Sequence, residues 1–254
     1  MIGPDHIVER LKAIVDARMR VLALIEALGE GNADEWVHTL AAILTRAQHH
    51  ADPDALLALE CITHATGDAA LPYVTRQRLY EAGIEQGLPA IARLFLTQSP
   101  AVEIPVTLQK QLGPERPLRP TGRPLTLGER KSAARTHDRE QLLLLVRDPH
   151  PQVVSILLDN PHVTEGDVVK MAAMRPGVPE SLALIVAHTK WSVRHAVKRA
   201  LVLNPSTPLA DAIRIATTLR VSELAEIAAD PSLPEQLRTH AAEVRAASSR
   251  RPQA

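Results

Sequence analysis

The chain has 254 residues, of which 45% are apolar and only 2% aromatic, and its 29 basic side chains balance 29 acidic ones. This length and apolar content suffice for a hydrophobic core, while the balanced charge is unlike that of a dedicated nucleic-acid binder. Leucine and alanine are abundant and there are only 11 glycines, which favours helices over sheets. The composition therefore predicts an all-α protein.

The distribution of charge and cysteine bears on location and partners. Cys61 is the only cysteine, which excludes an intramolecular disulfide and fits a reducing cytoplasm. Charges interrupt the N-terminal apolar residues and no later stretch reaches 18 uncharged apolar residues, so we expect a cytoplasmic protein with no signal peptide and no membrane span. Residues 1–100 carry 8 basic against 13 acidic side chains, and residues 101–254 carry 21 against 16. This asymmetry would let an acidic partner, or the N-terminal half itself, meet the C-terminal half.

The N-terminal residues 1–98 are predicted to form a helical bundle. Its first element is expected to be one long amphipathic helix over residues 5–28, started by Asp5 and ended by Gly29. The apolar stripe of this helix consists of Ile7, Leu11, Ile14, Val15, Leu22 and Ile25.

Four more helices are predicted within this bundle. One begins at Asn32, where Glu35 stands at capping-box spacing, and another begins at Asp52-Pro53, because proline is tolerated in a first helical turn. The last two are expected over about 72–85 and 89–96.

Residues 99–125 are predicted to be a proline-rich linker. Proline has no backbone N–H, so a helix does not continue through a segment with this many prolines. The prolines in question are Pro100, Pro105, Pro114, Pro117, Pro120 and Pro124. A disordered tail is expected at the other end of the chain, over residues 248–254.

Between these segments, residues 126–247 contain internal repeats. A leucine-containing phrase at 140–146 recurs at 180–186 and 222–228, at offsets of 40 and 42 residues. A second phrase, beginning with Asn160-Pro161, recurs from Asn204-Pro205 at an offset of 44. Self-similarity at this period predicts stacked helical units that bury each other's apolar faces. Each unit is expected to contain a helix, a break, a second helix that ends at Asn-Pro, and a third helix.

These motifs resemble a known class of helical repeats. Asp148-Pro149-His150-Pro151-Gln152-Val153-Val154, Lys190-Trp191-Ser192-Val193-Arg194-His195-Ala196 and the recurrent Asn-Pro resemble the HEAT-like repeat group and are similar to the leucine-rich repeat variant proteins. The resemblance covers about half the chain and implies a right-handed α-α superhelix, or solenoid, that binds another macromolecule. The iron–sulfur cysteine cluster that some leucine-rich repeat variant proteins carry is not matched by Cys61 alone.

The candidate partner-binding residues are Lys190, Trp191, Arg194 and Lys198. Trp191 either covers the seam between repeats or stands exposed as an interface anchor, and in the second case it is the preferred contact. The predicted function is a non-enzymatic adaptor or scaffold whose repeat surface binds another protein.

Two other functions stay open. The basic residues from Lys190 to Arg199, on a helix expected to begin at Ser192, could contact phosphates in a nucleic-acid-binding HEAT-like protein. The HEAT-like DNA glycosylases show that such a superhelix can hold a duplex, but they rely on aromatic side chains and a carboxylate around an exposed base, and this sequence offers only Trp191. An enzyme whose site is assembled only in space is the second alternative.

No complete catalytic, cofactor or metal motif is present, so no catalytic residue, cofactor or metal ligand is predicted. Cys61 and His64 lie three residues apart and could share a helix face near His49 or His50. A metal site needs three or four ligands, and an activated thiol needs a positioned base. We therefore predict a structural role for Cys61.

Overall fold

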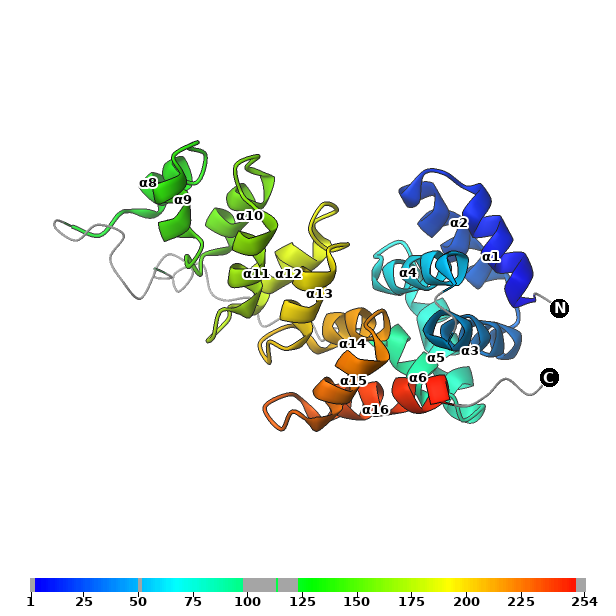
Figure 1. Cartoon of the computed structure of the whole chain (residues 1–254). Coiled ribbons are helices and arrows are strands. Elements are labelled where there is room, and N and C mark those ends of the chain that lie inside the picture. Colours follow the sequence, from blue (N-terminus) through cyan, green and yellow to red (C-terminus); the bar gives the residue numbers. More distant parts are fainter. Residues whose placement is uncertain (1–2, 50–51, 98–112, 114–122, 250–254) are drawn as a thin grey trace. The chain divides into compact units, whose positions relative to one another are not determined.

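The computed structural model describes residues 3–49, 52–97, 113 and 123–249, and all regular secondary structure in these ranges is helical. The prediction of an all-α protein is confirmed for this part of the chain. The helices divide into two units (Figure 1): unit 1 contains residues 1–97 and 209–254, and unit 2 contains residues 98–208.

Unit 1 begins with the helices predicted for the N-terminal bundle. They are α1 (Pro4–Ala13), α2 (Ala17–Glu30), α3 (Ala33–His49), α4 (Pro53–Gly67), α5 (Tyr73–Glu85), α6 (Pro89–Ala92) and the 3-10 helix η1 (Arg93–Phe95). The predicted starts of α3 and α4 are confirmed by side-chain caps. The Asn32 Oδ1 accepts a hydrogen bond from the Asp34 N–H at 2.8 Å, and the Asp52 Oδ1 accepts one from the Ala55 N–H at 3.2 Å.

The single helix predicted over residues 5–28 is wrong, because the chain breaks between α1 and α2. Asp16 caps α2 by accepting a hydrogen bond from its first turn at 2.8 Å, which requires extended backbone angles at that residue. The Arg20 Nη2 donates to the Ile14 carbonyl oxygen at 2.7 Å and so satisfies the end of α1. Val15, which was expected in the buried stripe, is 92% exposed.

Unit 1 is completed by three helices from the end of the chain. These are α14 (Leu209–Thr217), α15 (Val221–Ala229) and α16 (Glu235–Ser249). Helix α14 packs against α4 and η1, and α16 packs against α3 and α6. The Gln48 Nε2 donates to the Thr217 carbonyl oxygen at 2.9 Å, and Arg93 pairs with Glu243. The units therefore divide the chain differently from the predicted domains, because the predicted repeat region 126–247 is split after Pro208.

Two predicted segments fall largely on residues that the structure does not describe. Residues 98–112 and 114–122 of the expected proline-rich linker, and residues 250–254 of the expected tail, lie outside the described residues. The predicted start of that tail is wrong, because α16 continues to Ser249 and residues 248–249 are helical.

The part of unit 2 that the structure describes in full, residues 123–208, contains three successive helix pairs. They are α8 (Leu127–Ala133) with α9 (Arg139–Leu145), α10 (Pro151–Asp159) with α11 (Glu165–Ala173), and α12 (Pro179–Ala187) with α13 (His195–Val202). Helix α10 packs against both α8 and α12, and α11 packs against α13. Arg139 on α9 forms a 2.6 Å ion pair with Asp167 on α11. Neighbouring pairs therefore contact each other through alternate helices, as Figure 1 shows from green to yellow.

Equivalent leucines of the three leucine phrases are similarly buried. Leu142, Leu182 and Leu224 lie on α9, α12 and α15, and each is at most 2% exposed. The breaks that follow these helices also share a turn. Asp148, His188 and Asp230 each accept a hydrogen bond from the backbone N–H two residues later, at 3.0, 3.3 and 2.9 Å. Aspartate and histidine can form this local turn because each has a hydrogen-bond acceptor close to its own backbone.

Many helix ends in both units are closed by side chains from other segments. Gly87 is the one glycine with a positive φ among the described residues, so the left-handed glycine cap is rare here. Instead, the Asn160 Nδ2 donates to the Ala134 carbonyl oxygen at 2.9 Å, and the Asn204 Nδ2 donates to the Ala172 carbonyl oxygen at 2.7 Å. Other side chains with this role are Arg20, Gln48, Arg76, Arg78, Arg175, Trp191 and Arg214. Much of the chain's donor capacity is therefore used within the fold.

Candidate interaction surface

The structure places Trp191 inside unit 2. Its side chain is 3% exposed, and its Nε1 donates to the Leu158 carbonyl oxygen at the end of α10, at 2.9 Å. The Lys190 Nζ lies 4.0 Å from the centroid of the indole ring, and the His188 ring centroid lies 6.3 Å from it. Trp191 therefore covers the seam beside α10, which was one of the two predicted roles, and Lys190 lies over its outer face.

The other predicted binding residues are divided between surface and interior. Helix α13 begins at His195 rather than at Ser192, so Lys190 lies in the preceding turn and Arg194 is the N-cap residue. Arg194 is exposed, whereas Lys198 is only 8% exposed. The four predicted residues therefore do not share one exposed face, and only Lys190 and Arg194 present their side chains to solvent.

The predicted Cys61 environment is apolar and closed. Cys61 is buried on α4, and this burial raises the pKa of its thiol to about 12. His50 and the side chain of His49 lie outside the described residues. Among the residues whose positions are described, no group of three or more His, Cys, Asp or Glu side chains could hold a metal ion. The thiol is protonated at neutral pH and is shielded from reagents.

One buried histidine belongs to the core of unit 1. His240 on α16 is 0% exposed, and its Nε2 lies 2.8 Å from the Thr217 Oγ1. The Thr217 hydroxyl donates its hydrogen to the Ile213 carbonyl oxygen at 2.9 Å, so the Nε2 carries the hydrogen of the neutral ring. Burial, with a smaller contribution from nearby Arg93, lowers the pKa of His240 to about 3. The arrangement holds helices together and offers no proton exchange near neutral pH.

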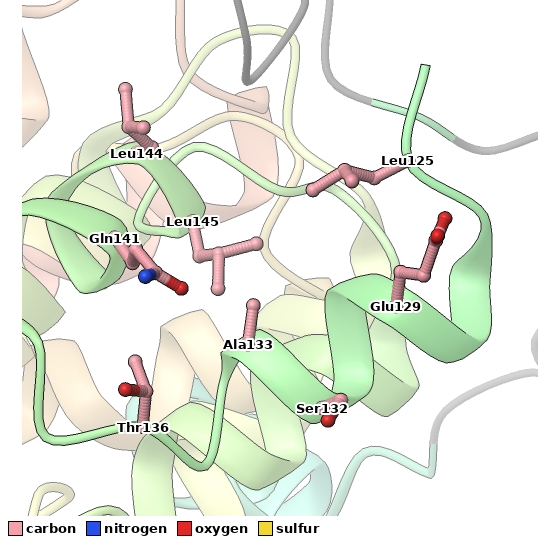
Figure 2. A pocket seen from close by; sticks show the side chains of 8 residues that line it. All are labelled: Leu125, Glu129, Ser132, Ala133, Thr136, Gln141, Leu144 and Leu145. Carbon is pink, nitrogen blue, oxygen red and sulfur yellow. The ribbon is translucent and has the colours of Figure 1, made fainter. Parts of the chain in front are cut away.

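A groove with a volume of about 540 Å³ lies beside α8 and α9 in unit 2 (Figure 2). Its lining residues are Leu125, Glu129, Ser132, Ala133, Thr136, Gln141, Leu144 and Leu145. Figure 2 shows Ala133 and Leu145 pointing toward each other across it. Leu143 and Leu144 on the same helix pair are 42% and 49% exposed. The groove could accept an apolar side chain.

Two polar residues of this groove, Glu129 and Gln141, are hydrogen-bonded to neighbouring groups. Both Glu129 carboxylate oxygens accept hydrogen bonds from the Arg123 guanidinium, at 2.8 and 2.6 Å, and the Thr126 N–H donates to Oε2 at 2.8 Å. These bonds, with that from Arg123 the strongest, lower the pKa of Glu129 to about 2. The Gln141 Nε2 donates to Asp138 at 2.9 Å. Because Glu129 is ionised at neutral pH, it is not a proton donor for a reaction in the groove.

Four of the ten large apolar side chains that are exposed among the described residues lie on α5, in unit 1. Tyr73, Tyr80 and Ile84 are 66%, 36% and 50% exposed, and Val74 beside them is 75% exposed. Tyr73, Gln77, Tyr80 and Ile84 follow one another at intervals of four, three and four residues. This spacing places their side chains in one narrow stripe along the helix. We call these five residues the α5 stripe.

Helix α5 buries its less apolar side. Its buried residues are Thr75, Arg76, Leu79, Ala82 and Gly83. At Gly83 an added Cβ would lie only 2.9 Å from the Ala92 Cβ, so glycine permits the close approach of α5 to α6. Leu79 is therefore the one bulky apolar side chain that α5 buries, while Tyr73, Val74, Tyr80 and Ile84 point to solvent, unlike the arrangement of an ordinary amphipathic surface helix.

The charged side chains exposed on α5 are acidic. Glu81 and Glu85 are exposed beside the stripe, and the Gln77 Nε2 donates to the Glu81 Oε1 at 2.9 Å. The two arginines of this helix are turned toward backbone carbonyls. Arg76 donates to the end of α4, and the Arg78 Nη2 donates to the Leu28 carbonyl oxygen at 2.8 Å. The α5 stripe is therefore an apolar surface with an acidic edge.

Sequence reasoning missed this surface although its spacing can be read from the sequence. Tyr73, Tyr80 and Ile84 have the periodicity of a core-facing stripe, and only tertiary packing decides which side of α5 is buried. The informative signal was the small residues Ala82 and Gly83 on the opposite side, because close helix packing requires small side chains.

Comparison with protein-family models, curated proteins and solved structures found no match. Within the described ranges, no helix combines the length and apolar character needed to cross a lipid bilayer.

Proposed function

We propose that this protein is a non-enzymatic, cytoplasmic adaptor that binds another protein through the α5 stripe. The observation that carries the proposal is the division of the aromatic side chains. The chain has five, and Trp36, Phe95 and Trp191 are at most 3% exposed. Both tyrosines, Tyr73 and Tyr80, are instead exposed in the same stripe of one helix.

The chemistry of tyrosine supports this function. A tyrosine ring supplies a large contact area at a low cost in side-chain entropy, and its hydroxyl stays hydrated or finds a partner at an interface. Ile84 and Val74 extend the apolar area on both sides of the tyrosines. A few such residues supply most of the binding energy of a typical protein interface.

We also propose that residues 126–247 derive from a HEAT-like repeat array, now divided between the two units. The support is the equivalent burial of Leu142, Leu182 and Leu224, together with the matching carbonyl caps from Asn160 and Asn204. The single, buried cysteine supports the proposed cytoplasmic location.

Nucleic-acid binding through Lys190 and Arg194 is the weaker candidate, because the burial of Lys198 interrupts the basic strip that it needs. Titration of a DNA duplex at low and high salt tests it directly. A nucleic-acid binder would lose affinity steeply with salt and on Lys190→Ala/Arg194→Ala. Absence of binding at low salt would eliminate this function.

The adaptor function is tested by capturing partners from lysate on the immobilised full chain. We compare wild type with Tyr73→Ala/Tyr80→Ala and with Met19→Ala, a control at a 58% exposed apolar residue on α2. Truncating an interface aromatic commonly costs about 1–2 kcal/mol, so the double variant should recover at least about tenfold less of a specific partner. The control should recover it fully. Equal recovery by all three proteins would contradict docking on α5.

A further inference from the structure

We propose that the occupant of the α5 stripe is an amphipathic helix with an apolar stripe of its own and lysine or arginine residues along one edge. This inference rests on the adaptor function and specifies the chemistry of its partner. Three features support it. The α5 stripe has the shape of a helix-packing surface, the backbone groups within α5 are already paired inside the helix, and acidic side chains lie along one edge of the stripe.

The shape of the stripe matches a helix. Residues 73 to 84 extend for about 16 Å along α5, at 1.5 Å per residue, and their spacing of 4, 3, 4 is that of a helix-packing seam. Side chains at such positions form a ridge that fits the groove between corresponding rows of a second helix. A partner helix of about three turns would therefore cover Tyr73, Gln77, Tyr80 and Ile84 together.

The backbone of α5 disfavours an extended occupant. An added β-strand obtains much of its affinity from main-chain hydrogen bonds to an exposed sheet edge. The N–H and carbonyl groups within α5 are paired inside the helix, and the described residues contain no strand that could supply an edge. Binding must therefore come from side-chain packing, which a helix provides with its own backbone already satisfied.

The charge beside the stripe selects basic residues. Glu81 and Glu85 are exposed one turn apart along one edge of the stripe. Arg76 and Arg78 form no ion pair with these two carboxylates, because their guanidinium groups are directed to carbonyl oxygens. The residues of unit 1 carry 14 basic against 19 acidic side chains, so the wider field has the same sign.

The test uses two 18-residue model peptides with identical leucine stripes, one with lysine and one with glutamate along the edges. Each is titrated into the full chain by fluorescence anisotropy at 150 mM salt. The lysine peptide should bind at least about tenfold more tightly than the glutamate peptide. Tyr73→Ala/Tyr80→Ala should weaken the lysine peptide at least about tenfold, and Met19→Ala should leave it unchanged.

Charge-reversal variants test whether the preference for the lysine peptide comes from Glu81 and Glu85 or from the net negative charge of unit 1. Glu81→Lys/Glu85→Lys should reverse the preference between the two peptides. The matched control is Glu26→Lys/Glu30→Lys, which makes the same net change at two exposed residues one turn apart on α2. This control should keep the preference for the lysine peptide. An equal effect of the two reversals, or no preference in the wild type, would overturn the proposal.

Sedimentation of the unliganded chain provides the remaining arm. A dimer that is lost in Tyr73→Ala/Tyr80→Ala would identify a second copy as the occupant and overturn the basic-helix proposal. The outcomes also separate the two proposals. If a cellular partner depends on both tyrosines while the lysine peptide does not bind, the adaptor function stands and the chemistry assigned to its partner is wrong.

Discussion

Replacing His240 with glutamine should remove a specific part of the acid sensitivity of unit 1. The pKa of His240 is about 3 in the folded protein, against 6.5 for an exposed histidine. Below pH 6.5 the unfolded chain therefore binds a proton that the folded chain does not. The stability contributed by the neutral ring is complete above pH 6.5 and is lost as the pH falls toward 3, by about 1.4 kcal/mol per pH unit. Between pH 7 and pH 5 the loss amounts to about 2 kcal/mol.

The physical cause of this loss is the surroundings of the ring. Its Nδ1 is buried without a hydrogen-bond partner, so a proton added there would find no acceptor. The nearby Arg93 guanidinium adds a smaller repulsion. Glutamine does not titrate in this range, and its side-chain amide can still donate to the Thr217 hydroxyl oxygen.

The assay is urea unfolding at pH 7 and pH 5, followed by tryptophan fluorescence. Each unit contains one tryptophan, so Trp191→Phe leaves the fully buried Trp36 as the reporter of unit 1. In this background, the protein with His240 should lose about 2 kcal/mol more between the two pH values than the His240→Gln protein. Other histidines contribute to both proteins and cancel in the difference. Equal losses would show that His240 accepts a proton in the native state and would refute the reasoning.

Three further predictions concern buried polar groups. Asn204→Ala should destabilise unit 2 by about 2 kcal/mol or more, measured by Trp191 fluorescence in urea, because two carbonyl oxygens lose their donor; an unchanged midpoint would contradict this. Asp148→Ala should cost about 3–5 kcal/mol, because the Arg130 guanidinium, whose side chain is 4% exposed, loses its carboxylate. The paired change Arg130→Met/Asp148→Leu should restore part of that loss, and failure to do so would argue against a charge effect. Iodoacetamide should modify Cys61 at pH 8 more than about 100-fold more slowly in the native protein than in urea, since its pKa is about 12 and it is buried. Comparable rates would show that α4 opens readily.

The helix starts were predictable where the signal lies within a few residues. Asn32, Asp52 and Thr126 each accept a hydrogen bond from a backbone N–H two or three residues later, so a local sequence pattern contains both partners. The order of helix, break and helix in the repeat phrases was predictable for the same reason, since Asp148 and Asp230 close their own turns.

The features that sequence reasoning missed depend on partners distant in the chain. Asp16 can continue a helix or cap one, and the cap is chosen here together with the contact of Arg20 to the end of α1. The assignment of α14 to unit 1 depends on Arg214, which donates to the Leu96 carbonyl oxygen 118 residues earlier. No local pattern specifies such a contact. The same limit applies to α5, because the position of α6 decides which of its sides is buried.

Several arginine side chains are already hydrogen-bonded within the fold, and this affects the choice between a protein and a nucleic-acid partner. Unit 2 has 15 basic against 10 acidic side chains, which by itself would favour phosphate binding. Arg130 and Arg139 nevertheless pair with Asp148 and Asp167, and Arg175 donates to a helix carbonyl. Turning such a group toward a phosphate would leave a carboxylate or carbonyl without its donor, at a cost that offsets much of the new contact. The exposed rings of the α5 stripe have no such contacts to lose, so the proposed helical partner on unit 1 could bind without breaking ion pairs or helix caps.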